Sequence, residues 1–402
     1  MAERDDDGAI RDLRSLAVPA AGGLVETGDP WEPYYISDPA GGRVGPVSEF
    51  LRDLQAAGRP ATTQRSYSLA LLRWFRFTWA IEVPWSQATR AEARDFCRWL
   101  QLAGKPGRPT AARALPGKRP PSARFAPSTV AHCETVCRSF YAYHLDAGTG
   151  PIVNPFPLAR PGRAHAHHNP MGPFPKQRSG LFRPRVSQRV PRQIPDAVFN
   201  ELFAGLGSNR DRALVAFWVS TGARASELLG VVRSGADPGQ QLITVTRKGS
   251  QAVQPLPASP DAFVWLRLYQ QETHGLVPAG PDDPLWWTLR RPFRPLAYNA
   301  ARMMFDRANA AVGAGWTLHS LRHSAAYRMA RDPDMPITDV QWVLGHASLT
   351  STQAYVVPTA EDVIEATLAH HRRQSEPRPA APEPAPGYRP ESLDALFGKG
   401  LW

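Results

Sequence analysis

Residues 221–229, which read TGARASELL, are the most informative part of this 402-residue chain. Gly222 is typical of a residue that ends one helix, and Arg224 then opens the next helix, with Glu227 three positions later. An arginine at a helix start, beside free backbone N–H groups, suits an anion such as a phosphate oxygen. Plain surface capping produces the same pattern, so the stretch indicates an anion site only in combination with other residues.

The sequence on both sides of this stretch predicts a mainly helical domain over residues 193–372. Apolar residues recur at helical spacing from Ile194 to Val219, just before the stretch. A single strand signal follows it, LITVT at 242–246, and the turn at 248–250 returns the chain through 253–256. Further helices are expected over 260–273, 296–312, 319–331, 336–344 and 360–371. The expected architecture is therefore a group of helices around one small β-sheet.

The first half of the chain carries a second, separate helical pattern. Val47, Phe50 and Leu51 recur at helical spacing, and similar patterns follow at about 62–78, 88–102 and 128–145. No strand signal interrupts these patterns, so residues 44–160 are expected to form a small all-α domain. Residues 1–43 mix acids, glycine and proline without periodicity, and we expect them to form a flexible arm.

Two basic segments rich in proline and glycine interrupt this organisation. Residues 103–126 hold six Lys or Arg and residues 161–192 hold seven, and neither segment contains an acid. Neither can form a regular helix, and 161–192 lies where a linker between the two domains is expected. The tail, 373–402, is also Pro-rich but closes with ESLDALFGKGLW, an amphipathic stripe too short to be stable without a groove to bury it.

Composition limits the class of protein. Lys and Arg number 47 against 36 Asp and Glu, so the formal net charge is +11, which favours a polyanionic partner. The 43% hydrophobic content supports packed cores, and three cysteines exclude a disulfide framework. The start, MAERDDDGAI, does not resemble a signal peptide, and no run of about 18 apolar residues predicts a membrane span. We therefore expect a cytoplasmic protein.

Further candidate functional residues lie downstream of the first stretch. Lys248 stands at the hairpin turn, from which it can reach a ligand, although a turn lysine is usually only a solvated charge. His319 and Arg322 are three positions apart, so they share one helix face and can contact one phosphate together. His346 follows a glycine at a predicted helix end, and Tyr355 comes nine residues later. Taken alone, a tyrosine of this kind is most often part of a core.

The order of these residues resembles the catalytic signature of the tyrosine recombinases, the lambda-integrase-like phage integrase family of DNA-breaking and rejoining enzymes. The TGxRxxEL box, the hairpin lysine, HxxR, and LGH followed nine residues later by tyrosine stand in family order. The resemblance covers about residues 44–372, and 44–160 is similar to the family's core-binding domain by position and helix count. The hairpin departs from the family because it continues as GSQAVQPLP, without further basic residues, which predicts fewer phosphate contacts.

The resemblance implies a mainly α protein in which a core-binding domain (44–160) and a catalytic domain (193–372) clamp double-stranded DNA. It implies site-specific recombination or integration through a covalent 3′-phosphotyrosine intermediate. It also implies a homo-oligomer, a monomer or dimer when free and a tetramer on paired sites.

The same resemblance assigns a role to each candidate catalytic residue. These residues are Arg224, Lys248, His319, Arg322, His346 and Tyr355. The tyrosine would be the nucleophile, the two arginines would hold the non-bridging oxygens, and the lysine would protonate the leaving 5′-hydroxyl. His319 would accept the tyrosine proton or orient the phosphate, His346 would donate a hydrogen bond to a phosphate oxygen, and Glu227 would orient its neighbouring arginine. No metal or cofactor is implied, because the cationic side chains supply the positive charge.

Two functions from other classes remain open at this point. A type IB topoisomerase shares this chemistry but works as a monomer and relaxes supercoils. A DNA-binding accessory protein would retain the same residues without using them. Relaxation of supercoiled plasmid without a specific site would favour the first, and a complete set of six catalytic-type residues argues against the second.

Three other features are more typical of structure than of function. The histidines between 165 and 168 have the right ligand type for a metal but no neighbouring Cys or acid. Cys133 and Cys137 lie four apart on a predicted helix, as core residues do, and a redox pair is the weaker interpretation. Trp286 and Trp287 are expected to pack a loop rather than to stack on a ligand.

Overall fold

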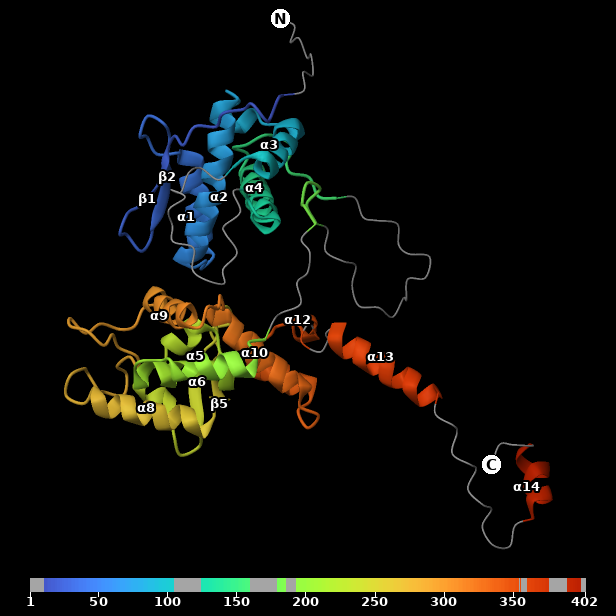
Figure 1. The fold of residues 1–402 in the computed structure, drawn as a ribbon. Coiled ribbons are helices and arrows are strands. Elements are labelled where there is room, and N and C mark those ends of the chain that lie inside the picture. Colours follow the sequence, from blue (N-terminus) through green and yellow to red (C-terminus); the bar gives the residue numbers. More distant parts are fainter. Residues whose placement is uncertain are drawn as a thin grey trace, which may run out of the picture. The chain divides into compact units, whose positions relative to one another are not determined.

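The computed structural model describes residues 11–104, 124–159, 179–185, 193–353, 355, 360–375 and 389–398. The chain divides into two compact units (Figure 1), Met1–Ala114 with Lys118–Gln188, and Leu115–Gly117 with Arg189–Trp402. Each unit has its own hydrophobic core. Among the described residues, no helix is long and apolar enough to cross a membrane. Most of the two basic segments, 103–126 and 161–192, and the histidines between 165 and 168 lie outside the described residues.

The described residues of the first unit form four helices and a short hairpin. In chain order its elements are β1 (Gly23–Glu26), β2 (Tyr34–Ser37), α1 (Gly45–Ala56), α2 (Ala61–Ala80), a 3₁₀ turn (Trp85–Gln87), α3 (Arg90–Leu102) and α4 (Pro127–Asp146). Residues at the helix starts explain where three of these helices begin. Helices α1 and α4 carry proline in the first turn, and α3 begins with a Thr89–Glu92 capping box. The four helices lie where the sequence predicts them.

Aromatic side chains fill the core of the first unit. Trp74 on α2 is fully buried, and its ring meets Phe96 edge-on at 5.1 Å and Phe156 at 5.2 Å. Its indole N–H donates to Tyr141 Oη over 3.1 Å, so the polar edge of the ring is satisfied. Cys133 and Cys137 are buried free thiols in this core, which confirms their structural interpretation.

The N-terminal residues differ from the flexible arm that the sequence predicts. Strands β1 and β2 pair antiparallel in the register Gly23↔Ser37 to Glu26↔Tyr34, and Ile36 is fully buried against the helices. Arg76 on α2 donates to the carbonyls of Ala21 and Gly22 at 2.7 and 2.8 Å. Each strand has only four residues, which is too short to produce a recognisable alternation in the sequence. Residues 11–43 are thus part of the folded unit.

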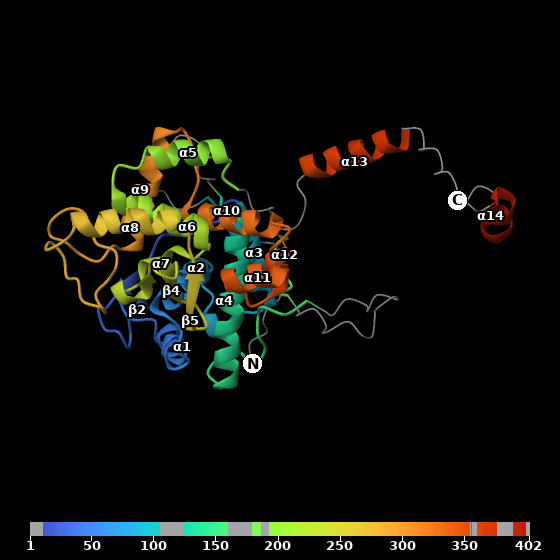
Figure 2. The same cartoon turned by 90° about the horizontal axis from the view of Figure 1, so that it is seen from below.

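The second unit has a central helix, a small sheet and several surrounding helices (Figure 2). Its first elements are α5 (Asp196–Ala204), α6 (Asn209–Thr221), α7 (Ala225–Leu229), a 3₁₀ turn (Arg233–Gly235), β3 (Ala236–Asp237), β4 (Leu242–Thr246) and β5 (Val253–Pro257). The later elements are α8 (Pro260–Glu272), α9 (Tyr298–Ala311), α10 (Leu318–Arg331), α11 (Ile337–Leu344), α12 (Leu349–Gln353), α13 (Ala360–Ser375) and α14 (Pro390–Phe397). The predicted hairpin and the helices predicted over 260–273, 296–312, 319–331 and 336–344 lie within about two residues of these bounds, whereas α13 continues four residues beyond the predicted end at 371.

Helix α6 is the centre of the second unit because two further helices, α8 and α10, pack on it. Its Leu214 and Phe217 are fully buried, and Trp286 packs edge-on against Phe217. The indole N–H of Trp286 donates to Leu228 O at 2.9 Å, so this tryptophan holds helix α7 in place through one of its backbone carbonyls. The tryptophan pair is therefore packed, as the sequence predicts.

The sheet has the antiparallel order β3-β4-β5, and its alternation decides which residues point inward. Strand β4 pairs with β5 from Leu242↔Pro257 to Thr246↔Val253. Ile243 and Val245 are buried, and Val253 across from the end of β4 is exposed. The residue two positions after Val245 on the same face is Arg247, which is also buried.

Candidate active site

Gly222 shapes the turn that presents Arg224. The glycine has φ +64°, and a Cβ at this position would lie 2.8 Å from Leu344 Cδ2 and 3.3 Å from Ala325 Cβ. Only glycine combines this left-handed backbone with so close an approach. Helix α6 therefore ends against α10 and α11, and α7 begins immediately afterwards with Arg224 as its N-cap residue.

Glu227 holds Arg224 and the start of the hairpin together. Its carboxylate is 3% exposed and accepts hydrogen bonds from Arg224 N at 3.0 Å, Arg224 Nη1 at 2.7 Å and Lys248 N at 3.0 Å. Burial by itself would raise the pKa of this carboxyl, but the hydrogen bonds from Lys248 and Arg224 lower the pKa below its usual value. The carboxylate therefore stays ionised and orients the arginine, as the sequence predicts.

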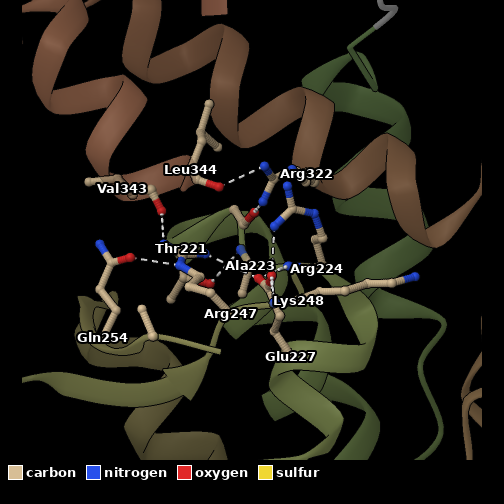
Figure 3. Close-up of polar contacts among 12 residues, drawn as sticks. Thr221, Ala223, Arg224, Glu227, Arg247, Lys248, Gln254, Arg322, Val343 and Leu344 are labelled. Atoms are coloured by element: carbon tan, nitrogen blue, oxygen red, sulfur yellow. Dashed lines mark hydrogen bonds and ion pairs between the residues drawn. The ribbon is translucent and has the colours of Figure 1, made fainter. Parts of the chain in front are cut away.

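Arg247 is a buried member of the same network (Figure 3). It is 3% exposed, and its guanidinium donates to Glu227 Oε2 at 3.1 Å, to Gln254 Oε1 at 2.7 Å and to the carbonyl of Val343. A Cβ at Gly345 would lie 2.8 Å from Arg247 Nε, so the backbone after α11 rests on this side chain. Arg247 thereby ties the hairpin to α7 and to the end of α11.

The backbone of Lys248 belongs to this network, but its side chain does not. Its backbone N–H is fixed by Glu227, whereas the side chain is exposed and extends away from the buried groups (Figure 3). An exposed ammonium on a fixed backbone suits a group that acts on a ligand outside the protein surface.

Arg322 on α10 is held by two carbonyl groups at helix ends. It is 2% exposed and donates to Gly222 O and to Leu344 O, each at 2.7 Å. Burial, together with the nearby charge of Arg224, lowers the pKa of this guanidinium to about 10. It remains charged at neutral pH. The two guanidinium groups repel each other, and Glu227 supplies one negative charge beside them. An added anion such as a phosphate would therefore bind favourably here.

His346 and Thr352 connect the end of α11 to helix α12. Gly345 has φ +61°, which closes α11, and His346 N then donates to Gln341 O at 3.1 Å. The imidazole Nδ1 lies 2.9 Å from Thr352 Oγ1. Burial, reinforced by the charges of Arg322 and Arg224, lowers the pKa of His346 to about 4, so the ring is neutral at pH 7.

Tyr355 lies in this same site although it is 33 residues beyond Arg322. It is 6% exposed, its ring stacks on that of His346 at 6.3 Å, and its hydroxyl lies 2.7 Å from His323 Nδ1. Burial raises the pKa of the Tyr355 hydroxyl, while the positive charges of Arg322 and Arg224 oppose that rise. A phenol hydroxyl is a nucleophile, and two neighbouring guanidinium groups provide positive charge for an anion beside it.

The structure thus brings Arg224, Arg322, His346 and Tyr355 together. His319 joins them through its ring contact with His323 at 4.3 Å. Lys248 is tied to the site by its backbone N–H, which donates to Glu227, while its side chain extends away from the cluster.

Two contributing residues escaped the sequence analysis, and each left a signal there. His323 lies four positions after His319 on the same helix face, and Arg247 continues the inward alternation of strand β4. Within the part of the chain that the structure describes, no cluster of three or more His, Cys, Asp or Glu could hold a metal ion.

Comparisons with known proteins place the chain beside one family. Residues 194–362 match the model of the phage integrase family. The chain is 28% identical over 198 residues to the tyrosine recombinase XerD of Pseudomonas aeruginosa, covering 47% of this chain and 65% of the relative. It is 30% identical over 216 residues to the tyrosine recombinase XerC of Methylobacterium nodulans, covering 50% and 64%. The chain therefore spans a little under two thirds of the length of these curated relatives.

Solved structures with the same fold include DNA complexes. The integrase of the transposon Tn1549, in complex with transposon right-end DNA, matches with a TM-score of 0.56 at 14% identity, covering 81% of this chain and 98% of that chain. A lambda integrase dimer bound to a core site matches with a TM-score of 0.53 at 14% identity, covering 84% and 78%. At this identity the likeness concerns the fold, and it confirms the predicted class of a helical unit followed by a mainly helical unit with a small sheet.

Proposed function

Because the chain belongs to the phage integrase family of tyrosine recombinases, we propose that it cleaves and rejoins DNA at specific sites through a covalent 3′-phosphotyrosine. The observation that carries the proposal is the convergence of Tyr355 with Arg224 and Arg322 in one buried site. The two guanidinium groups alter the pKa of the tyrosine hydroxyl, so the three side chains interact electrostatically before DNA is bound.

The proposed reaction gives each of these groups one role. Tyr355 Oη attacks the scissile phosphorus and the bond to the 5′ oxygen breaks. The two arginines stabilise the additional negative charge on the non-bridging oxygens. Lys248, with its exposed ammonium, gives a proton to the departing 5′ oxygen. His346 donates a hydrogen bond to a phosphate oxygen from the ring nitrogen opposite its contact with Thr352. Energy of the broken bond is retained in the phosphotyrosine, so the 5′-hydroxyl of another strand can reverse the step.

The proposed partners are double-stranded DNA and further copies of the chain. Among the related structures, one is a transposon integrase in complex with transposon DNA and another is a lambda integrase dimer bound to a core site. We extend this to a monomer or dimer when free and a tetramer on paired sites, in the cytoplasm, where its DNA substrate lies. Helix α14 exposes Leu396 and Phe397, and we propose that this amphipathic end docks in a groove of a neighbouring subunit.

The test is trapping of a covalent adduct on nicked duplexes that cover the DNA flanking the gene. A nick beside the cleaved bond releases a short fragment, so rejoining is prevented and the adduct accumulates. Tyr355→Phe should bind the same duplex and form no adduct, while the control Tyr327→Phe on α10 should form it normally. An adduct of normal yield with Tyr355→Phe would refute the assignment of the nucleophile. Relaxation of any supercoiled plasmid, without a specific site, would instead favour a topoisomerase.

A further inference from the structure

One hydrogen bond in this site involves a residue, His323, that is not among the six candidate catalytic residues. His323 Nδ1 lies 2.7 Å from Tyr355 Oη, the atom that attacks phosphorus under the proposed function. His323 is partly buried on α10, one helical turn after His319. Its neighbourhood contains His319 and Arg322 on its own helix and His346 and Tyr355 on the segment after α11.

We propose that His323, and not His319, accepts the proton that Tyr355 loses when it attacks the phosphate. This inference rests on the proposed function, because it requires Tyr355 to be the nucleophile. It makes His323 a catalytic residue, since its ring nitrogen contacts a reacting atom.

The geometry distinguishes the three histidines of the site. His346 lies face to face with the Tyr355 ring, 6.3 Å away and with 8° between the ring planes, and its Nδ1 is engaged with Thr352. A stacked ring does not direct its in-plane lone pair at the hydroxyl. His319 meets the edge of His323 at 4.3 Å, and among the described residues it forms no hydrogen bond with the tyrosine. His323 alone of the three has a nitrogen at proton-transfer distance from Oη.

The electrostatic state of His323 suits an acceptor. Burial, followed by the effects of His319, Arg322 and His346, lowers its pKa to about 4, so the ring is neutral at pH 7 and Nδ1 can accept the tyrosine proton. Bound phosphate would bring negative charge beside Arg322 and Arg224, and the imidazolium would then be less unfavourable. Proton transfer is therefore coupled to the formation of the bond to phosphorus.

The proton balance closes within the site. The Tyr355 O–H bond breaks and its proton moves to His323 Nδ1, while Oη bonds to phosphorus and the bond to the 5′ oxygen breaks. The 5′ oxygen takes a proton from Lys248. When a 5′-hydroxyl attacks the phosphotyrosine in the reverse step, Lys248 regains a proton and the His323 imidazolium returns one to Tyr355 Oη.

The experiment compares His323→Asn and His323→Ala in single-turnover cleavage, with the full chain and the nicked duplex that traps the adduct. Asparagine places an oxygen near the position of Nδ1, where it can accept the hydrogen bond but cannot take the proton. Both variants should cleave about 10²–10⁴-fold more slowly than the wild type. The exposed His274→Asn serves as the matched control and should cleave normally.

Two readouts separate proton transfer from a structural role. A duplex with sulfur in place of the 5′-bridging oxygen has a leaving group that needs no acid, so it should restore cleavage by Lys248→Ala but not by His323→Asn. Added imidazole should speed His323→Ala in proportion to its free-base concentration. If His323→Ala does not fold, as judged by circular dichroism and half-site binding, the sulfur substrate with His323→Asn still decides.

Opposite results would overturn the inference. Wild-type rates with His323→Asn would show that the bond only positions the tyrosine, and restoration of that variant by the sulfur substrate would place His323 on the leaving-group side. The proposed function fails by a different result, an adduct formed by Tyr355→Phe, so the two failures are distinguishable.

Discussion

Replacing Arg247 with methionine should destabilise the second unit and slow DNA cleavage, although this residue does not contact DNA in the proposed reaction. Methionine has a similar length and no charge, so the change removes three hydrogen bonds from a side chain that is 3% exposed. The carbonyl of Val343 and the amide oxygen of Gln254 lose a donor, and Glu227 loses one of its two cationic partners.

The expected loss of stability follows from these contacts. Removing one partner of a buried ion pair costs about 3–5 kcal/mol. Glu227 keeps Arg224 and the Lys248 N–H, so we expect the lower end, about 3 kcal/mol. For a unit of roughly 200 residues, each kcal/mol shifts Tm by about 2–4 °C, which gives a decrease of about 6–12 °C.

The assay should report on the second unit separately from the first. Hydrogen–deuterium exchange of the full chain in increasing urea measures the opening free energy of strands β4 and β5 directly. Arg267→Met on the exposed side of α8 is the matched control and should change this free energy by less than about 0.5 kcal/mol. A double-mutant cycle with Glu227→Gln should be non-additive, because both changes break the same pair.

A loss below about 1 kcal/mol with Arg247→Met, or strict additivity with Glu227→Gln, would refute this reasoning. Either result would mean that the buried network contributes no more than an exposed ion pair. Cleavage should also slow in Arg247→Met at temperatures where the unit stays folded, since the backbone of Lys248 shares the Glu227 carboxylate with Arg247.

Two further expectations concern pH and salt. The free energy of unfolding of the second unit should fall as pH drops from 6.5 toward 4, because burial lowers the pKa of His323 and of His346 to about 4 and the unfolded imidazoles bind protons first. Each contributes at most about 1.4 kcal/mol per pH unit, and His346→Gln should flatten this part of a urea-unfolding pH profile. Replacing the Lys and Arg of 161–192 with Gln should reduce the log–log slope of DNA affinity against salt by ~0.9 for each phosphate that is no longer neutralised, and an unchanged slope would identify a solvated linker.

The sequence by itself determined the helices, the hairpin and the order of the candidate catalytic residues. Helical spacing of apolar residues and local capping act over a few positions, so α8, α10 and α11 could be placed within about two residues. The motif around Arg224, the hairpin Lys248, HxxR, and the tyrosine after Gly345-His346 together gave six candidate residues. The distances between these side chains could not be predicted, because spacing along a chain says nothing about distances between helices.

Tertiary structure decided what those residues contact. The hairpin of β1 and β2 forms because Ile36 and the carbonyls before Gly23 are bound by the helical core, whereas strands of four residues carry no independent signal. Arg247 gains its role from Val343, 96 positions away, and His323 gains its role from Tyr355, 32 positions away. Contacts of this kind arise when separate helix ends meet over one buried site, and burial there is also what shifts the pKa values of His323, His346 and Arg322.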